Sequence, residues 1–174
     1  MGTTAVQELD KVVIKFAGDS GDGMQLTGTQ FTGTSALLGN DIATFPDFPA
    51  EIRAPQGTVA GVSGFQVHIG QTHIYTPGDQ PDVLVAMNAA ALKANLDQVA
   101  RGKTIIVDID NFKRKDYEKA GFKEDPLENG LLNDYHVVEA PITSLTKTAL
   151  EDMGLDNKSI TRSKNMFALG MVYW

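Results

Sequence analysis

The residues of this chain best placed to do chemistry are Gly18-Asp19-Ser20-Gly21-Asp22-Gly23, a loop between an apolar run at 12–17 and a helical pattern at 24–38. Its three glycines permit a sharp turn with positive φ from a strand into a helix. Such a junction directs backbone N–H groups outward at the helix N-terminus, where a phosphate or a carboxylate can bind. The loop is therefore a candidate anion site.

Two features of this glycine loop depart from the common nucleotide cradles. The Rossmann fingerprint requires a second glycine where Ser20 stands, and the Walker fingerprint requires Lys-Ser/Thr where Met24-Gln25 stand. Asp19 and Asp22 also put negative charge where an anion would dock. A structural interpretation stays open beside the binding one, in which Asp22 caps the helix and Gln25 completes a capping box.

A second candidate is the run Glu51-Ile52-Arg53, which falls in a proline-rich segment at 44–57 with no usable periodicity. We expect that segment to be an ordered but irregular loop. Glu51 and Arg53 could form a local ion pair, or the planar guanidinium of Arg53 could clamp a carboxylate or a phosphate. The one basic cluster, at 113–115, is followed at once by acidic residues and is expected to be solvated surface.

Two histidines invite a metal interpretation, which the residues around them do not support. Gly70-Gln71 has the form of a two-residue hairpin turn, with a returning strand at 72–76 that would set His68 beside His73. No cysteine or third histidine stands nearby to complete a ligand set. We therefore predict no metal site in this chain.

The elements that must position these residues alternate between strands and helices. Such alternation predicts a three-layer α/β/α fold of Rossmann-like type, with a sheet that is mostly parallel but made mixed by the hairpin. Asn88 is expected to cap a helix, and Gly102 and Gly154 to follow helix ends. Strands are expected at 12–17, 59–69, 83–87, 104–107 and 135–138, and helices at 24–38, 89–99, 143–153 and from 163 or 165, with a charged excursion at 111–134.

Composition excludes several classes of function. The 174 residues suffice for one domain with a hydrophobic core, and the net charge of −7 argues against a nucleic-acid backbone as partner. The absence of cysteine excludes disulfides, cysteine nucleophiles and iron–sulfur ligands within this chain. No apolar run reaches membrane-spanning length and no secretory signal is visible, so we expect a cytoplasmic location and no membrane partner.

The final stretch, 166–174, is an apolar helical pattern without a polar cap or a charged tail. It either packs into the core or continues into further polypeptide. We expect continuation, with 1–174 forming one domain at the N-terminus of a longer subunit.

Several motifs together resemble a known family, the 2-oxoacid:ferredoxin oxidoreductases. The resemblance is to their gamma domain, which in fused enzymes forms the N-terminal part of the alpha subunit. The motifs occur in the family's order and cover nearly the whole chain. They are residues 16–23 (FAGDSGDG), 45–55 (FPDFPAEIRAP), 61–67 (GVSGFQV), 81–87 (PDVLVAM) and 165–170 (NMFALG).

The resemblance implies an assembly that converts a 2-oxoacid, coenzyme A and oxidised ferredoxin into an acyl-CoA, carbon dioxide and reduced ferredoxin. Thiamine diphosphate and the iron–sulfur clusters would lie outside this chain, which would hold no catalytic residue of its own. The partners implied are the alpha-proper region of the same polypeptide, a beta subunit and ferredoxin, in an oligomer. The substrate favoured by the resemblance is 2-oxoglutarate.

For this chain, the resemblance implies a place on the coenzyme A side of the active site and in subunit packing. Gly18, Gly21 and Gly23, with Asp19, Ser20 and Asp22 between them, become the loop at the ligand edge, and Glu51 and Arg53 occupy the family's Glu-x-Arg position. Separate gamma subunits carry a Gly-Gly-Gln-Gly type loop and Gly-Gly after the arginine, whereas this chain has Ala54-Pro55 there, as the fused type tolerates. The alternative is an assembly domain that touches no ligand.

Overall fold

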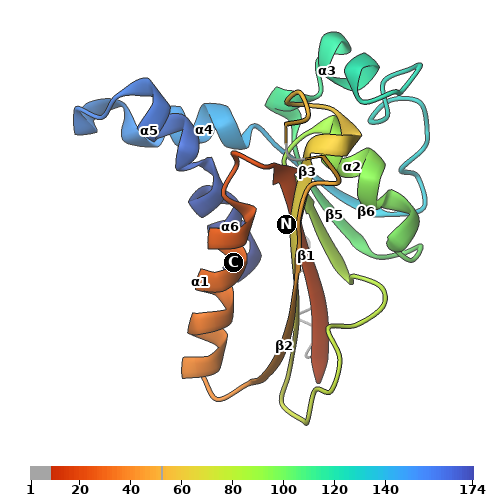
Figure 1. Cartoon of the computed structure of the whole chain (residues 1–174), viewed down its shortest axis with the longest axis vertical. Helices are drawn as coiled ribbons and strands as arrows, with labels where there is room; N and C mark the ends of the chain where they lie inside the picture. Colours follow the sequence, from red (N-terminus) through yellow and green to blue (C-terminus); the bar gives the residue numbers. More distant parts are fainter. Residues whose placement is uncertain (1–8, 52) are drawn as a thin grey trace, which may run out of the picture.

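The computed structural model describes residues 9–51 and 53–174, in which six strands form one mixed sheet (Figure 1). The order across the sheet is β2-β3-β1-β4-β5-β6. The four strands β1, β4, β5 and β6 are parallel to one another, whereas β3 is antiparallel to both of its neighbours, β1 and β2. The strands are β1 (Lys11–Asp19), β2 (Asp41–Asp47), β3 (Val62–Gly70), β4 (Val83–Ala86), β5 (Thr104–Asp108) and β6 (His136–Ala140).

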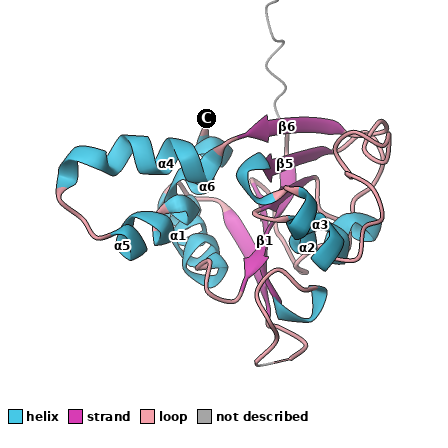
Figure 2. Cartoon of the chain, turned by 90° about the horizontal axis from the view of Figure 1, so that it is seen from above, coloured by secondary structure: helices cyan, strands magenta, loops and turns pink. Residues whose placement is uncertain are grey.

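Helices cover both faces of this sheet, so the expected three layers are present (Figure 2). One hydrophobic core lies between one face of the sheet and the helices α1 and α6. A second core lies between the other face and the helices α2 and α3. The helices are α1 (Met24–Leu37), α2 (Ala89–Asn95), α3 (Arg114–Lys119), α4 (Ile142–Leu150), α5 (Asn157–Arg162) and α6 (Lys164–Tyr173). Short 3-10 turns lie at Val59–Gly61, Leu96–Gln98, Ile109–Asn111 and Glu151–Met153.

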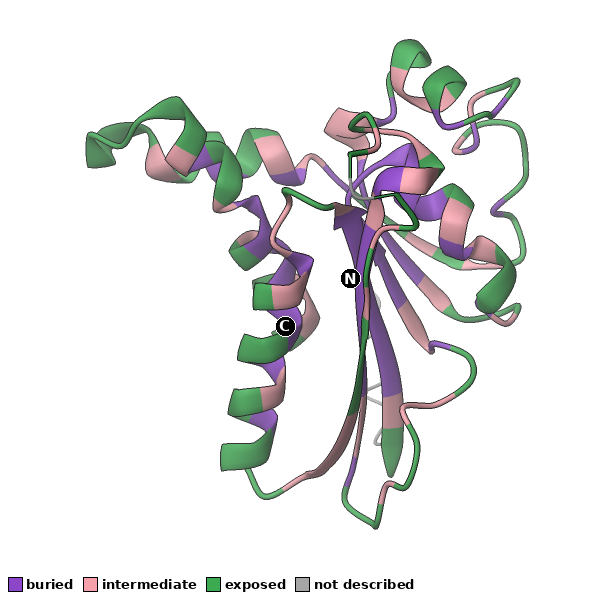
Figure 3. Cartoon of the chain, in the orientation of Figure 1, coloured by how far each residue is buried: buried purple, intermediate pink, exposed green. Residues whose placement is uncertain are grey.

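The central strand β1 owes its position to an apolar run that is buried on both sides. Because side chains alternate along a strand, Phe16 enters the core beneath α1, and Ala17 enters the core beneath α2. Figure 3 shows the buried residues concentrated on the central strands and on the inner sides of α1 and α6, whereas α4 and α5 are largely exposed.

Several predicted local signals are confirmed. The Asn88 side chain accepts a hydrogen bond of 2.8 Å from the Ala91 N–H and so caps α2. Gly154 follows the helical segment that begins at α4, with φ of 64°. Gly102 also has positive φ, 77°, after the turn that follows α2. Among the described helices, none is long and apolar enough to cross a bilayer.

The prediction of an irregular loop at 44–57 is wrong in its first part. Residues 41–47 form β2, which pairs with β3 so that Pro46 lies opposite Phe65. A proline lacks the N–H that a ladder needs, but β2 is an edge strand and bonds on one side only. Pro46 therefore indicates a loop in the sequence, although the strand forms in the structure.

The predicted hairpin at Gly70-Gln71 is also wrong. β3 already pairs with β1 on one side and with β2 on the other, so no free edge is left for residues 72–76. The Ile74 N–H donates to Asp41 Oδ2 instead, at 2.8 Å. His68 Nδ1 lies 2.7 Å from the Thr76 carbonyl oxygen, and His73 Nδ1 lies 3.5 Å from Asp41 Oδ2. Within the described ranges, no cluster of three or more His, Cys, Asp or Glu could hold a metal ion.

The contact between α1 and β3 generates a stability prediction. A Cβ on Gly28 would lie 2.1 Å from Cδ1 and 2.8 Å from Cβ of Phe65, so the helix can approach the strand this closely only with glycine there. Gly28→Ala is expected to lower the free energy of unfolding by about 2 kcal/mol through overpacking.

Gly33 provides the matched control, because it lies in the same helix with open space where its Cβ would be. Gly33→Ala is expected to raise the free energy of unfolding by about 1 kcal/mol through helix propensity. Urea unfolding of both variants measures the difference, and equal changes would show that the Phe65 contact does not limit the packing.

Candidate functional site

The candidate site lies where the parallel strands end and the helices change sides. α1 follows β1 on one face of the sheet, and α2 follows β4 on the other. The chain therefore diverges between the carboxyl ends of these neighbouring strands, which is where open α/β sheets bind their ligands. The glycine loop, residues 18–23, forms one wall of this crevice.

The glycine loop turns into α1 through Gly23, which has φ of 76° and stands at the N-cap without a side-chain hydrogen bond. A Cβ on Gly23 would lie 2.4 Å from Nδ2 of Asn165, so both backbone angle and space demand glycine. Gly18 is crowded as well, since its Cβ would lie 2.9 Å from Asp22 Oδ2. A Cβ on Gly21 would meet Gln56 only at ordinary contact distance, 3.7 Å.

The predicted capping box of Asp22 and Gln25 is wrong. Asp22 is not the N-cap residue, and its Oδ2 accepts from the Asp19 N–H at 3.1 Å, inside the loop. The Gln25 side chain does not cap its own helix; its Nε2 donates to the Gly64 carbonyl oxygen at 2.7 Å, and this bond joins α1 to β3. The left-handed Gly23 removes Asp22 from the capping position, so sequence spacing alone misplaced it.

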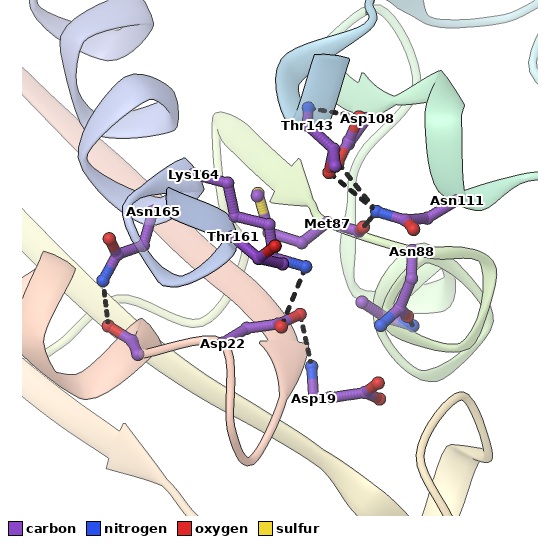
Figure 4. A network of polar contacts seen from close by, with 12 residues as sticks. Asp19, Asp22, Met87, Asn88, Asp108, Asn111, Thr143, Thr161, Lys164 and Asn165 are labelled. Carbon is purple, nitrogen blue, oxygen red and sulfur yellow. Dashed lines mark hydrogen bonds and ion pairs between the residues drawn. The ribbon is translucent and has the colours of Figure 1, made fainter. Parts of the chain in front are cut away.

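A lysine from the far end of the chain neutralises Asp22. Lys164 Nζ lies 2.8 Å from Asp22 Oδ1, and the two side chains are only 10% and 14% exposed. The next residue, Asn165, donates through Nδ2 to the Gly23 carbonyl oxygen at 3.4 Å. Figure 4 shows Lys164 and Asn165 reaching the loop from the first turn of α6. Sequence reasoning missed Lys164; the available signal was a lysine at the start of an otherwise apolar helical pattern.

Asp19 fastens the glycine loop to the segment that follows β2. Its carboxylate accepts from the Gly57 N–H, with Oδ1 at 3.0 Å and Oδ2 at 3.1 Å. Burial raises the pKa of the Asp19 carboxyl, and the nearby Asp22 carboxylate adds to the rise, although the Gly57 hydrogen bond opposes it. The Ser20 N–H donates to the Gly61 carbonyl oxygen at 3.2 Å, a second link to the same segment.

Two polar hollows flank the glycine loop. One of about 240 Å³ lies at the strand ends, and Asp19 and Lys164 form part of its wall together with Gln56, Gly57, Asn88, Ala89, Ala90, Asn111, Asp116 and Lys119. The other, of about 450 Å³, faces α5 and is lined by Gly21, Asp22, Gln56, Asn157, Lys158, Thr161 and Arg162. Lysine and arginine side chains thus surround a loop whose two acids are already bonded, which is an arrangement able to hold an anion.

A buried carboxylate braces the strand ends behind the first hollow. Asp108 Oδ2 accepts from Thr143 Oγ1 at 2.6 Å and from Asn111 Nδ2 at 2.7 Å. Asn111 Nδ2 also donates to the Met87 carbonyl oxygen at 3.1 Å, so the network joins β4, β5 and α4 (Figure 4). Burial raises the pKa of Asp108, and the hydrogen bonds from Thr143 oppose the rise. No buried side-chain N or O atom among the described residues lacks a hydrogen-bond partner, which indicates a structural role for this network.

Glu51 and Arg53 lie outside both hollows, on the exposed surface of the segment between β2 and β3. Among ion pairs of the described residues, none joins Glu51 to Arg53, so the local pair is not formed. The Glu51 backbone bonds to that of Ala60, and Gly57 of the same segment binds Asp19. The segment that carries Glu51 and Arg53 is therefore joined to the glycine loop at Gly57, through the Asp19 carboxylate.

Comparison with known proteins gives this geometry a context. A profile of the pyruvate ferredoxin/flavodoxin oxidoreductase family matches residues 13–174. The 2-oxoglutarate oxidoreductase subunit KorA of Mycobacterium tuberculosis is 55% identical over 168 residues, which are 97% of this chain and 26% of that protein.

Solved structures agree with this match. A 2-oxoglutarate:ferredoxin oxidoreductase from Magnetococcus marinus, with 2-oxoglutarate, coenzyme A and succinyl-CoA bound, has a TM-score of 0.66 and 28% identity over 94% of this chain and 24% of that one. The chain thus spans about a quarter of the length of these two relatives.

Two further structures are more distant in sequence and support the fold alone. A keto/oxoacid ferredoxin oxidoreductase gamma subunit from Geobacter sulfurreducens has a TM-score of 0.64 and 18% identity over 93% of this chain and 74% of its own. A pyruvate oxidoreductase subunit from Thermotoga maritima has a TM-score of 0.55 and 14% identity over 95% of this chain and 96% of its own.

The ion pair between Lys164 and Asp22 generates a second stability prediction. Lys164→Met is expected to lower the free energy of unfolding by about 3 kcal/mol, because it leaves a nearly buried carboxylate unpaired. In a double-mutant cycle with Asp22→Asn, measured by urea unfolding, the coupling energy is expected to be about 2 kcal/mol. Lys158→Met, at an exposed position on α5, should change stability by less than about 0.5 kcal/mol. Additive effects at 22 and 164 would show that the pair contributes nothing.

The raised pKa of Asp19 generates a prediction on pH. The ordinary pKa of an aspartate carboxyl is 3.8, and at pH values above it the folded protein binds the Asp19 proton more tightly than the unfolded chain does. The contribution of Asp19 to stability is therefore lost as pH rises through the folded pKa. The free energy of unfolding of the wild type, minus that of Asp19→Asn, is therefore expected to fall as pH rises above about 4.

Asp41 serves as a control of opposite sign. Its pKa is lowered, chiefly by the hydrogen bond from the Ile74 N–H, so its contribution is present above 3.8 and is lost as pH falls below that value. The corresponding difference between the wild type and Asp41→Asn should increase with pH over the acid range. Urea unfolding at a series of pH values measures both, and a flat profile for Asp19 would contradict the assignment.

Proposed function

The chain belongs to the pyruvate ferredoxin/flavodoxin oxidoreductase family, and on this basis we propose that it is the gamma-type domain of a 2-oxoacid:ferredoxin oxidoreductase. The family resemblance noted from the sequence is confirmed by this match, and the fold is that of gamma-type relatives. The assembly would convert a 2-oxoacid, coenzyme A and oxidised ferredoxin into an acyl-CoA, carbon dioxide and reduced ferredoxin. The high identity to a 2-oxoglutarate oxidoreductase subunit supports 2-oxoglutarate as the 2-oxoacid.

This chain is proposed to contribute to the coenzyme A side of the active site. The observation that carries the proposal is the glycine loop itself, which lies at the strand ends between two polar hollows, with Asp22 paired to Lys164 and Asp19 hydrogen-bonded to Gly57. Ser20 and Gly21 lie on the exposed side of the turn, where a ligand can approach closely, whereas Gly18 and Gly23 pack against Asp22 and Asn165. The ion pair with Lys164 compensates the charge of Asp22, and the hydrogen bond from the Gly57 N–H partly stabilises that of Asp19, so both carboxylates would repel an incoming phosphate less than free ones.

Cations around the loop would supply the attraction for the phosphates of coenzyme A. Lys158 and Arg162 line the larger hollow, and Lys164 and Lys119 line the smaller one. Arg53, with Glu51 beside it, extends from the segment that Asp19 anchors, and its guanidinium could bind a phosphate through two hydrogen bonds. Glu51 and Arg53 line neither hollow, so their assignment to the ligand edge rests on the family's Glu-x-Arg position and on the link of their segment to Asp19.

Other components of the reaction are proposed to lie elsewhere in the assembly. The chain contains no cysteine and so has no thiolate with which to hold an iron–sulfur cluster. Thiamine diphosphate and the clusters would belong to the alpha-proper region, the beta subunit or other parts of the complex, with ferredoxin as the electron acceptor. Residues 1–174 would form a single domain of a longer alpha subunit, in an oligomer.

A second candidate function is assembly without ligand contact. The observation that favours it is the fit of the loop against α6, where Lys164 bonds Asp22 and Asn165 fills the space beside Gly23. If the loop is only a tight turn, substitutions in it should alter assembly and leave coenzyme A binding unchanged. The two candidates therefore differ in one measurable quantity, the affinity for coenzyme A.

Arg53→Ala provides the test of the first candidate. In the assembled enzyme, the variant is expected to bind coenzyme A about tenfold more weakly, the loss of one charge-assisted contact. Isothermal titration with coenzyme A and steady-state turnover measure the effect. Arg101→Ala is the matched control, since Arg101 is exposed and pairs only with Asp134 at 3.3 Å. Unchanged affinity for coenzyme A and unchanged turnover in Arg53→Ala would show that Arg53 does not take part in coenzyme A binding.

A further inference from the structure

A large hollow in the described part of the chain lies at the opposite end of the sheet from the glycine loop. This apolar groove has a volume of about 810 Å³. Val83 and Thr104, the first residues of β4 and β5, form part of its floor, and Phe167 and Met171 of α6 form part of one wall. Its other lining residues are Val12, Ile14, Ile106, Val138, Gly170, Val172 and Trp174.

The groove exists because the helices do not cover this face of the sheet completely. α1 packs chiefly on β3, β1 and β2, and α6 packs against α1 and α4. The connection from β5 to β6 runs over the other face, where residues such as Phe112, Phe122 and Leu132 join the core beneath α2. No helix in the described ranges therefore lies over the amino-terminal part of β5 and β6 on the α6 side.

The chemistry of the groove selects a protein segment over a small polar ligand. No charged side chain lines it, and its polar side-chain groups are the Thr104 hydroxyl and the Trp174 indole N–H. Sites for small ligands combine an apolar lining with several convergent polar groups, which are lacking here. An uncovered apolar surface of this kind marks a docking site, and Trp174 is fully exposed at its rim although tryptophan is normally buried.

We propose that the groove is filled by an apolar segment from the remainder of the longer subunit, which packs against β5, β6 and α6. The inference rests on the proposed function, in which this chain is one domain of such a subunit. Relatives are about four times as long as the chain, and Trp174, the last of its residues, lines the groove. A polypeptide that continued as in these relatives would leave α6 directly beside the exposed apolar surface.

Footprinting of the groove tests this proposal without reference to coenzyme A. In the 174-residue chain Met171 is partly exposed and Trp174 fully exposed, so hydroxyl radicals can reach both, and their oxidation can be followed by mass spectrometry of the peptide that contains them. In the full-length subunit, both residues are expected to be oxidised at least about fivefold more slowly, because packing excludes water. Equal oxidation rates in the two proteins, or a coding sequence that stops at Trp174, would overturn the proposal.

A matched pair of variants identifies the groove as the cause of the protection. Gly170→Phe places a ring in the groove, and Gly33→Phe places one on the outer side of α1; neither Cβ has a neighbour within 4 Å. In the full-length subunit, Gly170→Phe is expected to abolish most of the protection of Trp174, whereas Gly33→Phe should preserve it. Val138→Gln, on the edge strand β6, is the second variant if Gly170→Phe does not fold.

Other outcomes assign the groove to a different occupant. Full protection in Gly170→Phe would mean that the segment packs elsewhere. Concentration-dependent protection in the 174-residue chain, with a dimer by sedimentation, would mean that a second copy fills the groove. Both results would overturn the proposal. Failure of the proposed coenzyme A role would appear instead in the Arg53→Ala titration, with the footprint unchanged.

Discussion

The ion pair between Asp22 and Lys164 is the constraint on which the site depends. It joins the first loop of the fold to its last helix, in a position where both side chains are almost excluded from water. An unpaired charge in such a place would be costly, so the pair holds the two segments in one relative position. Asn165 completes the fit by occupying the space that a side chain at position 23 would need. The shape of the glycine loop and the placement of α6 are thus set together.

This pairing also resolves an apparent conflict in the loop. Two aspartates in six residues are unsuited to anion binding while their charges are free. Here one carboxylate is paired with Lys164 of α6 and the other accepts a backbone N–H, while Lys158 and Arg162 of α5 line the neighbouring hollow. A motif that departs from the common phosphate fingerprints can therefore still present an environment for an anion, because elements remote in sequence supply the compensating charge.

Much of the fold was predictable from local signals, whereas the completed site was not. Signals within a few neighbouring residues suffice to predict β1 from its apolar run, the turn into α1 from its glycines, and the start of α2 from the Asn88 cap. β2 was missed because Pro46 signals a loop unless the strand is known to lie at an edge. The hairpin failed because Gly70 pairs with both β1 and β2, a fact of topology. Lys164 and the buried Lys15, which bonds Asp47 and Gln98, act through contacts that no spacing rule anticipates.

The link between Gly23 and Asn165 spans 142 positions of the chain, which bears on how the molecule acquires its structure. Contacts between distant positions form late, since the entropy of closing a large loop opposes them. During synthesis the sheet residues emerge well before α6, and the glycine loop lacks its lysine until that helix leaves the ribosome. The glycine loop would therefore take its final conformation late, after β1 through β6 have paired. A nascent chain would carry a folded sheet before the turn at the end of β1 had its partners from α6.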